Sequence, residues 1–396
     1  RTAILGYSET DRVTAIEPVI DVRRWFDDER VLSGKLVVDT LTGASATGAV
    51  PSDQPQTFTR PSGNGSYTTS PGETPLDDTF RDTRVALAFG WSQPLSRAFD
   101  GRIDLNVSNE YDYLSLGLSA QLGYDFHRNN SRLTFGLGAA QDTISPEGGV
   151  PRPSAEAGFR PDRQEPIQSE TDFSASRLGA EEDKTTLDAL LGFTQVIDRR
   201  SLLQLNLSIS QSDGYQTDPF KVVSVVDSVS GQPLRQLYEN RPDSRIKTAA
   251  FVRYKRAFRA RDVLDTSYRF LTDDWGLSSH TVDLRYRFAL GSSAAYLRPH
   301  LRLYQQSAVD FFRYFLVDGD TLPTEVTADY RQGDMTAFTL GLEYGRQYTR
   351  RQWGVALEYY RQTGSEPDNA PGQLGQQELA PDVSAVLLRL NYDFGL

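Results

Sequence analysis

The chain has no cysteine, only three histidines and no long apolar run. Without cysteine it can form neither a disulfide framework nor a zinc site built from thiolates. No stretch approaches the roughly 18–20 consecutive apolar residues that a membrane-crossing helix needs, and the mean hydropathy is -0.48. The net charge of -11 argues against a nucleic-acid partner. None of these observations excludes a transmembrane β-barrel, because apolar and polar residues alternate along its strands and therefore average to a polar hydropathy.

Alternation of apolar and polar residues is abundant instead, and it is clearest in residues 384–396. The last stretch places every second side chain on one apolar face, in the order Val386, Leu388, Leu390, Tyr392 and Phe394. The other face carries Arg389 and Asp393. A period of two residues indicates a strand, and this one resembles the closing strand of a bacterial outer-membrane barrel. We expect its apolar row to face lipid, and we expect it to pair with residues 3–9.

The same alternation recurs along the chain and predicts about 16 strands. They lie at 3–9, 13–26, 31–41, 82–93, 102–112, 113–126, 131–142, 184–197, 201–212, 245–258, 262–273, 278–289, 295–309, 335–348, 352–363 and 383–395. Most are long enough for a tilted membrane span, which takes roughly 9–11 residues. The predicted fold is all-β: one transmembrane, antiparallel, up-and-down β-barrel domain over residues 1–396.

The connections between these strands differ in length at the two ends of the predicted barrel. Short turns lie at 27–30, 94–101, 127–130, 198–200, 259–261, 290–294 and 349–351, and long loops at 43–78, 145–183, 213–243, 310–334 and 364–381. Loop 213–243 also contains a candidate hairpin, V-V-S-V-V-D-S followed by P-L-R-Q-L-Y-E. Short periplasmic turns and long extracellular loops are typical of outer-membrane barrels. An even strand number then predicts two periplasmic termini in an exported, processed chain.

If the apolar faces meet lipid, the polar faces line the lumen. Four adjacent strands then aim a basic patch inward: Arg245, Lys247, Arg253, Lys255, Arg269, Arg285, Arg287, Arg298, His300 and Arg302. Strands of the first half aim an acidic wall inward: Glu17, Asp21, Asp39, Asp104, Asp125 and Asp188. Two interpretations are open. The charges pair across neighbouring strands and solvate the lumen, or two walls of opposite sign produce a field that selects ions.

Catalytic and metal-binding patterns are sparse. His280 lies beside Ser278, Ser279, Asp273 and Asp274, and outer-membrane hydrolases place Ser/His or Asp/His sets at such positions. The alternation, however, puts His280 on the lipid-facing side with Val282. We therefore expect no enzyme, no metal site and no bound cofactor.

Two motifs near the start of the chain carry a resemblance. Y-S-E-T-D-R-V at Tyr7–Val13 and V-V-D-T-L-T-G-A-S at Val37–Ser45 resemble a bacterial family of unknown function whose members are expected to be outer-membrane barrels of this length. The resemblance implies a location in the outer membrane and a link to extracytoplasmic redox chemistry through partner proteins. There is no C-x-x-C-H, so any redox centre would belong to a partner. From the residues alone, Asp39 is expected at a strand end beside Gly43, where its carboxylate would accept backbone N–H groups.

These observations support two main hypotheses of function. The first is a porin-like channel with a charged lumen, because a barrel of this strand number can enclose an aqueous channel. The second is a structural sheath or anchor for a periplasmic or surface partner in a redox or secretion complex. An outer-membrane hydrolase is a weak third. Outer-membrane lipids are expected partners in each case.

Overall fold

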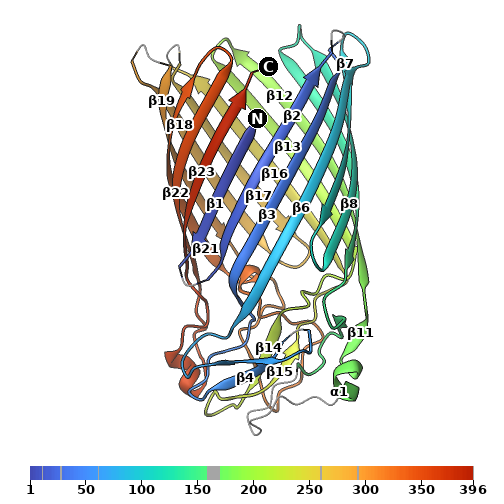
Figure 1. The fold of residues 1–396 in the computed structure, drawn as a ribbon, viewed down its shortest axis with the longest axis vertical. Coiled ribbons are helices and arrows are strands. Elements are labelled where there is room, and N and C mark those ends of the chain that lie inside the picture. Colours follow the sequence, from blue (N-terminus) through green and yellow to red (C-terminus); the bar gives the residue numbers. More distant parts are fainter. Residues whose placement is uncertain are drawn as a thin grey trace.

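The computed structural model contains a closed antiparallel barrel of sixteen strands (Figure 1). It describes residues 1–396 except 11, 27–28, 61, 158–169, 259–260, 292–293 and 396, and except the side chains of 78–80 and 170–172. The barrel strands are β1 (Thr2–Glu9), β2 (Thr14–Trp25), β3 (Val31–Ala46), β6 (Leu76–Pro94), β7 (Phe99–Asn109), β8 (Tyr113–Phe126), β9 (Ser131–Ile144), β12 (Glu182–Asp198), β13 (Ser201–Gly214), β16 (Ser244–Ala257), β17 (Val263–Asp273), β18 (Ser278–Ala289), β19 (Ala295–Gln306), β21 (Met335–Gln347), β22 (Arg351–Gly364) and β23 (Val383–Phe394). The all-β, sixteen-stranded prediction is confirmed.

The barrel closes where the first and last strands meet. β1 pairs with β23 from Thr2 opposite Tyr392 to Glu9 opposite Ala385, and with β2 on its other edge. Every other barrel strand pairs with its neighbours in chain order. Closure removes all free edges, as a lipid-embedded sheet requires, because an unpaired backbone group in hydrocarbon is costly. The predicted pairing of residues 3–9 with the C-terminal strand is confirmed.

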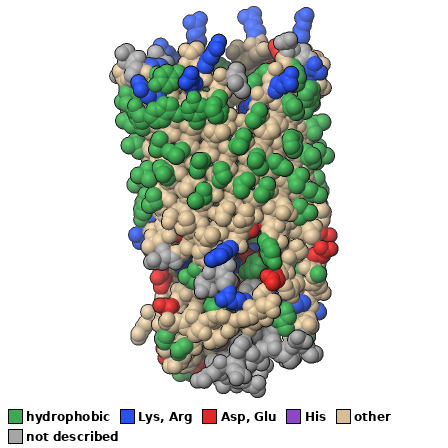
Figure 2. All heavy atoms as spheres, viewed as in Figure 1, with side chains coloured by type: hydrophobic (Ala, Val, Ile, Leu, Met, Phe, Trp, Pro, Cys, Tyr) green, Lys and Arg blue, Asp and Glu red, His purple; other side chains and the backbone are tan. Residues whose placement is uncertain are grey.

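The outer surface of the barrel is an apolar belt (Figure 2). On β23, Val386, Leu388, Leu390 and Phe394 are exposed on the outside, as the alternation predicts. Aromatic pairs in ring contact gather at the short-turn ends of the strands: Phe99–Tyr124 is stacked, Tyr286–Phe288 is tilted and Tyr392–Phe394 is edge-to-face. An apolar band edged by aromatic residues is the surface that outer-membrane barrels present to lipid. Among the described residues, no helix is long and apolar enough to cross a membrane.

The two ends of the barrel differ as predicted, although some boundaries move. Both termini and the short turns lie at one end, and the long connections lie at the other (Figure 1). β3 and β6 pair from Ala46 opposite Leu76 onward, so the connection expected at 43–78 is shortened from both sides. Three of the predicted turns, 27–30, 259–261 and 290–294, include residues outside the described part of the chain.

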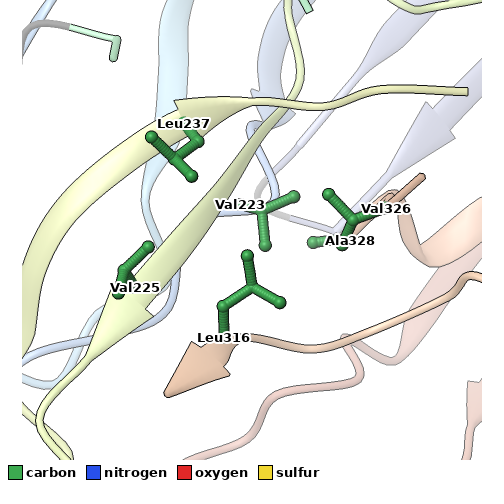
Figure 3. Close-up of a cluster of buried hydrophobic side chains, with 6 residues drawn as sticks. All are labelled: Val223, Val225, Leu237, Leu316, Val326 and Ala328. Carbon is green, nitrogen blue, oxygen red and sulfur yellow. The ribbon is translucent and has the colours of Figure 1, made fainter. Parts of the chain in front are cut away.

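The long connections fold together into a structure that we call the cap. The predicted hairpin is confirmed as β14 (Val222–Val226) paired with β15 (Pro233–Tyr238), and β20 (Leu316–Val317) adds a parallel third strand. Buried side chains of these strands and of the loop that follows β20 form a small apolar core (Figure 3): Val223, Val225, Leu237, Leu316, Val326 and Ala328.

Smaller elements complete the cap. They are β4 (Gln56–Thr59) with β5 (Ser66–Thr69), β10 (Val150–Pro151) with β11 (Arg177–Gly179), α1 (Glu170–Ala175), and the 3-10 turns η1 (Tyr330–Gln332) and η2 (Gly372–Gln376). Distant loops are joined directly, because Ser52 Oγ donates to Gln232 and the Gln373 side chain accepts from the Asp53 backbone. The loops therefore form a packed layer of their own.

Candidate functional site in the barrel lumen

Three of the four basic-patch residues on β16 are paired with carboxylates of β17. Asp265 accepts from Arg253 at 2.6 Å and lies 3.2 Å from the Lys255 ammonium. Arg245, at the cap end of the same strand, is paired with Asp273. The alternation that directs bases inward on β16 also directs acids inward on β17, so cross-strand pairing follows from the register.

His300 is the centre of a second group, on β18, β19 and β22. Its Nε2 lies 2.9 Å from Asp283 and its Nδ1 lies 3.0 Å from Glu358, so both ring nitrogens contact carboxylates. Arg285 also lies 3.3 Å from Asp283. His300 itself is buried. Because carboxylates of β18 and β22 contact both ring nitrogens, the His300 ring links three strands and neither nitrogen is free to contact a substrate.

Glu343 of β21 organises a third group. It is 3% exposed, and it accepts from Tyr296 at 2.7 Å, from Arg389 at 3.2 Å and from Arg298. The guanidinium of Arg287 lies over the Tyr296 ring, 4.2 Å from its centroid. Long side chains from four strands therefore fill this side of the lumen.

Asp39 lies inside β3 and not at its end, which corrects the expectation for the D-T-L-T-G-A-S motif. Its carboxylate accepts from Arg84 of β6 at 2.8 Å, rather than from backbone N–H groups. The strand continues past it to Ala46 because the bulge at Gly43–Ser45 keeps the pairing with β6 intact. Gly43 has φ 142°, and a Cβ there would meet the Arg12 carbonyl oxygen at 2.2 Å, so this position accepts only glycine.

Three further residues of the predicted acidic wall are also paired with arginines. Asp21 lies 3.2 Å from Arg23, Asp104 lies 2.5 Å from Arg102, and Asp125 lies 2.8 Å from Arg132. The remaining two, Glu17 and Asp188, have neither an ion pair nor a hydrogen bond to a described side chain. In the basic patch the same is true of Lys247, Arg269 and Arg302, and on β3 of Lys35, which the sequence reasoning did not single out.

The wall from β3 to β17 includes a stretch of small inward side chains that borders open space. A cavity of about 420 Å³ is lined by Lys35, Ser115, Ser119 and Asp188, among others. A second, also of about 420 Å³, shares Ser119 and Asp188 and adds Lys247. These two adjoin along the wall from β3 to β17, which we call the open wall. A third cavity of about 700 Å³ lies toward the short-turn end, shares Lys35 with the first and extends past β1 and β2 to Ala356 and Arg389 of β22 and β23.

The wall from β18 to β23, which we call the packed wall, is filled by its own side chains. Small residues that face the lumen here are buried: Ala337 and Thr339 are each 8% exposed and Ala356 is 1% exposed. A Cβ at Gly345 would meet the Tyr296 ring at 2.5 Å. On the open wall, a Cβ at Gly138 meets nothing closer than 3.5 Å. The two cavities of about 420 Å³ therefore border the open wall, and the cavity of about 700 Å³ reaches the packed wall only at β22 and β23.

The cap crosses the mouth of the barrel at the long-loop end. On one side Val222 donates its N–H to Thr47, directly after β3. Halfway round the ring, Trp275 between β17 and β18 packs edge-to-face on Phe311, with ring centroids 5.1 Å apart. Next to it, Gln306 of β19 donates to the Gly333 carbonyl at 2.8 Å. Contacts on opposite sides of the ring hold the cap over the lumen.

A group of buried charges joins the cap loops near β3. Arg241 lies 2.6 Å from Glu239 and 2.9 Å from Asp329, and Arg331 bridges Asp329 and Asp218. Burial raises the pKa of Glu239 to about 7, against the opposing effect of Arg241. Burial acts on Asp329 too, but Arg331 outweighs it and holds the pKa of that carboxyl below its usual range. The network ties residues 218–241 to residues 329–331.

His280 lies on the outer face of the barrel, as the alternation predicted. Its Nδ1 is 2.7 Å from the Tyr268 hydroxyl, and its ring lies against Phe270. Neither neighbour is a serine or a carboxylate, so the described residues assemble no Ser/His or Asp/His set around this histidine. Within the part of the chain that the structure describes, no group of three or more His, Asp or Glu side chains is placed to hold a metal ion.

Comparisons with known proteins identify the family of this barrel. A family profile described as "Protein of unknown function (DUF3570)" matches residues 1–394. The chain belongs to the DUF3570 family. The resemblance carried by the two N-terminal motifs is thereby confirmed. No curated protein matches this DUF3570 sequence.

Solved structures of outer-membrane proteins resemble this DUF3570 barrel at low identity. The ferric enterobactin receptor PfeA of Pseudomonas aeruginosa matches with a TM-score of 0.47 and 9% identity over 93% of this chain and 55% of its own. The siderophore receptor PirA of Acinetobacter baumannii matches with 0.45 and 8% over 99% and 58%. A bacterial polysaccharide outer membrane secretin matches with 0.44 and 9% over 99% and 97%. This chain spans about half the length of the two receptors.

Sequence reasoning missed the carboxylates that complete the lumen pairs, Glu343 and Glu358, as well as Arg84 and Lys35. The alternation contains the signal for direction: on β21, Leu340 and Leu342 face outward, so Glu343 faces inward. The pairing of acidic with basic side chains depends on the register between neighbouring strands, and the sequence of a single strand does not specify that register.

Proposed function

We propose that the protein is a porin-like outer-membrane channel whose charged lumen is covered by a cap at its outer mouth. The observation that carries the proposal is the series of cavities along the open wall. Small inward side chains leave space there beside charged residues such as Lys35 and Asp188, and a sixteen-stranded barrel has the diameter for an aqueous path. We see no catalytic arrangement that competes with it among the described residues.

The proposed orientation places the short turns and both termini in the periplasm and the cap outside the cell. The asymmetry of the connections supports it, because outer-membrane barrels have short periplasmic turns and longer extracellular loops. Whole-cell labelling tests it. Asp320→Cys in the cap should react with a membrane-impermeant maleimide on intact cells. Arg97→Cys in a short turn should react only after the outer membrane is permeabilised, and the reverse pattern would reject the orientation.

Single-channel recording in planar bilayers tests the channel itself. We expect rare openings from the wild-type protein, because the cap lies across the mouth. Arg241→Ala removes the central cation of the buried cap network and should raise the fraction of time spent open at least several-fold. Lys255→Gln, a lumen charge remote from the cap, is the matched control. If neither the wild type nor the cap variant conducts, the channel function is wrong.

A second candidate function is a sheath or anchor for a partner in an extracytoplasmic redox or secretion complex. Two observations favour it: the cap covers one mouth, and exposed arginines of the short turns lack side-chain partners among the described residues, namely Arg97, Arg128, Arg199 and Arg350. A stoichiometric partner that co-purifies in mild detergent, and is lost when these arginines are changed to glutamine, would favour this function over the channel.

A further inference from the structure

We propose that the open wall holds a binding site for a small hydroxylated carboxylate of the sugar-acid class, built from Asp188, Ser210, Lys247 and Arg269. The proposal rests on the proposed channel function in one respect only: it names the solute that such a channel would admit. The site lies in the cavity of about 420 Å³ that these four residues line together.

The register of four strands places three of the four residues in one row across the wall, and Arg269 of β17, opposite Phe251, lies off this row on the side of the short turns. Asp188 on β12 is opposite Gly138 of β9 on one side and Ser210 of β13 on the other. Ser210 is in turn opposite Lys247 of β16. Adjacent strands lie about 4.8 Å apart, so the backbones that carry Asp188 and Lys247 are separated by roughly 10 Å. In this row Ser210 lies between Asp188 and Lys247, and Gly138 lies on the other side of Asp188.

Asp188 and Lys247 have no ion-pair partner among the described residues because of the residues that lie opposite them on the neighbouring strands. The neighbours of Asp188 are glycine and serine, which provide no cation. The strand partner of Lys247 on its other side is Asp273, whose carboxylate is taken by Arg245. Elsewhere on the same two strands, Arg253 and Lys255 share Asp265. Unpaired charges that face a cavity retain their full capacity for a ligand, whereas the paired ones do not.

The arrangement selects the chemistry of the ligand. Lys247 and Arg269 offer donors to a carboxylate, while Asp188 and the Ser210 and Ser119 hydroxyls suit hydroxyl groups. An aldonate or uronate has its carboxylate at one end and hydroxyls along a six-carbon chain, so it can reach both ends of the row. An α-amino acid holds its two charges too close together to do so, and a neutral sugar leaves both cations without an anion.

Ligand-observed NMR titration of the purified full-length protein in detergent tests the site with sodium gluconate, glucose and glycine as probes. We expect gluconate to bind at least tenfold more tightly than glucose or glycine. The double variant Lys247→Gln/Arg269→Gln should weaken gluconate binding at least tenfold, and Asp188→Asn should weaken it several-fold. Lys255→Gln removes the same charge from the same strand at a paired position, and it should leave binding unchanged.

Three results would overturn the site: no gluconate binding, equal binding of gluconate and glucose, or an equal loss with Lys255→Gln. Resistance to SDS at room temperature confirms that each variant is folded. The binding assay needs no ion current, so the two proposals fail separately. Gluconate binding without conductance would reject the channel and keep the site, and conductance without gluconate binding would reject the site alone.

Discussion

The open wall and the packed wall are built from the same alternating strands, yet they use their inward positions in opposite ways. On the packed wall, long side chains of one strand cover the glycines and alanines of the next, as Tyr296 covers Gly345. Beside the two cavities of the open wall, small residues face small residues, as Gly138 faces Ser119, whereas nearer the short turns Gly123 is covered by Arg132. Lumen space in a barrel of fixed strand number is therefore decided by which side chains lie opposite one another, and not by strand count alone.

The charges follow the same division. On the packed wall Glu343 shares Arg298 and Arg389. The open wall has pairs too, such as Asp104 with Arg102, but beside its cavities it keeps Lys35, Asp188 and Lys247 without a side-chain partner among the described residues. Paired charges stabilise the barrel and unpaired ones remain available to solutes, so removing a charge should have different consequences on the two walls.

The largest effect is expected from Glu343→Ala. The substitution leaves two arginines and the Tyr296 hydroxyl without their common acceptor. Losing one partner of a buried pair costs about 3–5 kcal/mol, and the low end, about 3 kcal/mol, applies because both arginines are more than a third exposed. Asp188→Ala on the open wall should change stability by no more than about 0.5 kcal/mol. Guanidinium unfolding in detergent measures both, and equal losses would erase the distinction between the walls.

The cap extends the comparison to a third region, where charges are buried as on the packed wall. Because burial raises the pKa of Glu239 to about 7, the folded cap binds a proton more tightly than the unfolded loop does. Falling pH between 7 and 4.5 therefore stabilises the cap, and rising pH through this window up to 7 removes that stabilisation. The difference between pH 5.5 and pH 8 is about 2 kcal/mol. Asp329, whose pKa is lowered, acts in the opposite direction only at lower pH.

Hydrogen exchange of β14, corrected for the intrinsic pH dependence, measures this effect. Protection should be greater at pH 5.5 than at pH 8 in the wild type. The Glu239→Gln variant has no titratable group at position 239, so its β14 amides should show the same protection at pH 5.5 and at pH 8. A wild-type cap that is more protected at pH 8 would contradict the assignment of Glu239.

A smaller effect separates two glycines. Gly345→Ala forces a Cβ against the Tyr296 ring and against the Trp353 carbonyl oxygen at 2.8 Å, and overpacking of this kind costs about 1–3 kcal/mol. Gly138→Ala has ordinary contacts only, so it should be neutral within about 0.5 kcal/mol. The same unfolding assay compares them, and a neutral Gly345→Ala would show that the packed wall has room to relax.

The barrel could be predicted from the sequence because one physical rule repeats sixteen times. Lipid outside and water inside force a period of two, so strand positions, closure by residues 3–9 and the outward row of β23 follow from it. The pairing of Asp39 with Arg84 could not be predicted, because it depends on the register between β3 and β6 across a long connection. The cap was only partly predictable: its hairpin has local alternation, whereas the Glu239–Arg241–Asp329 group joins loops far apart in sequence.

The most direct test of the central claim, that free lumen space lies along the open wall, uses the absence of cysteine from the chain. Single cysteines are introduced at Ser210 and Ser119 on the open wall and at Thr339 on the packed wall, in protein held in detergent. Their rates of reaction with a small charged methanethiosulfonate reagent are then measured. We predict that the first two react at least tenfold faster than the third. Equal rates, or faster reaction at Thr339, would contradict the account.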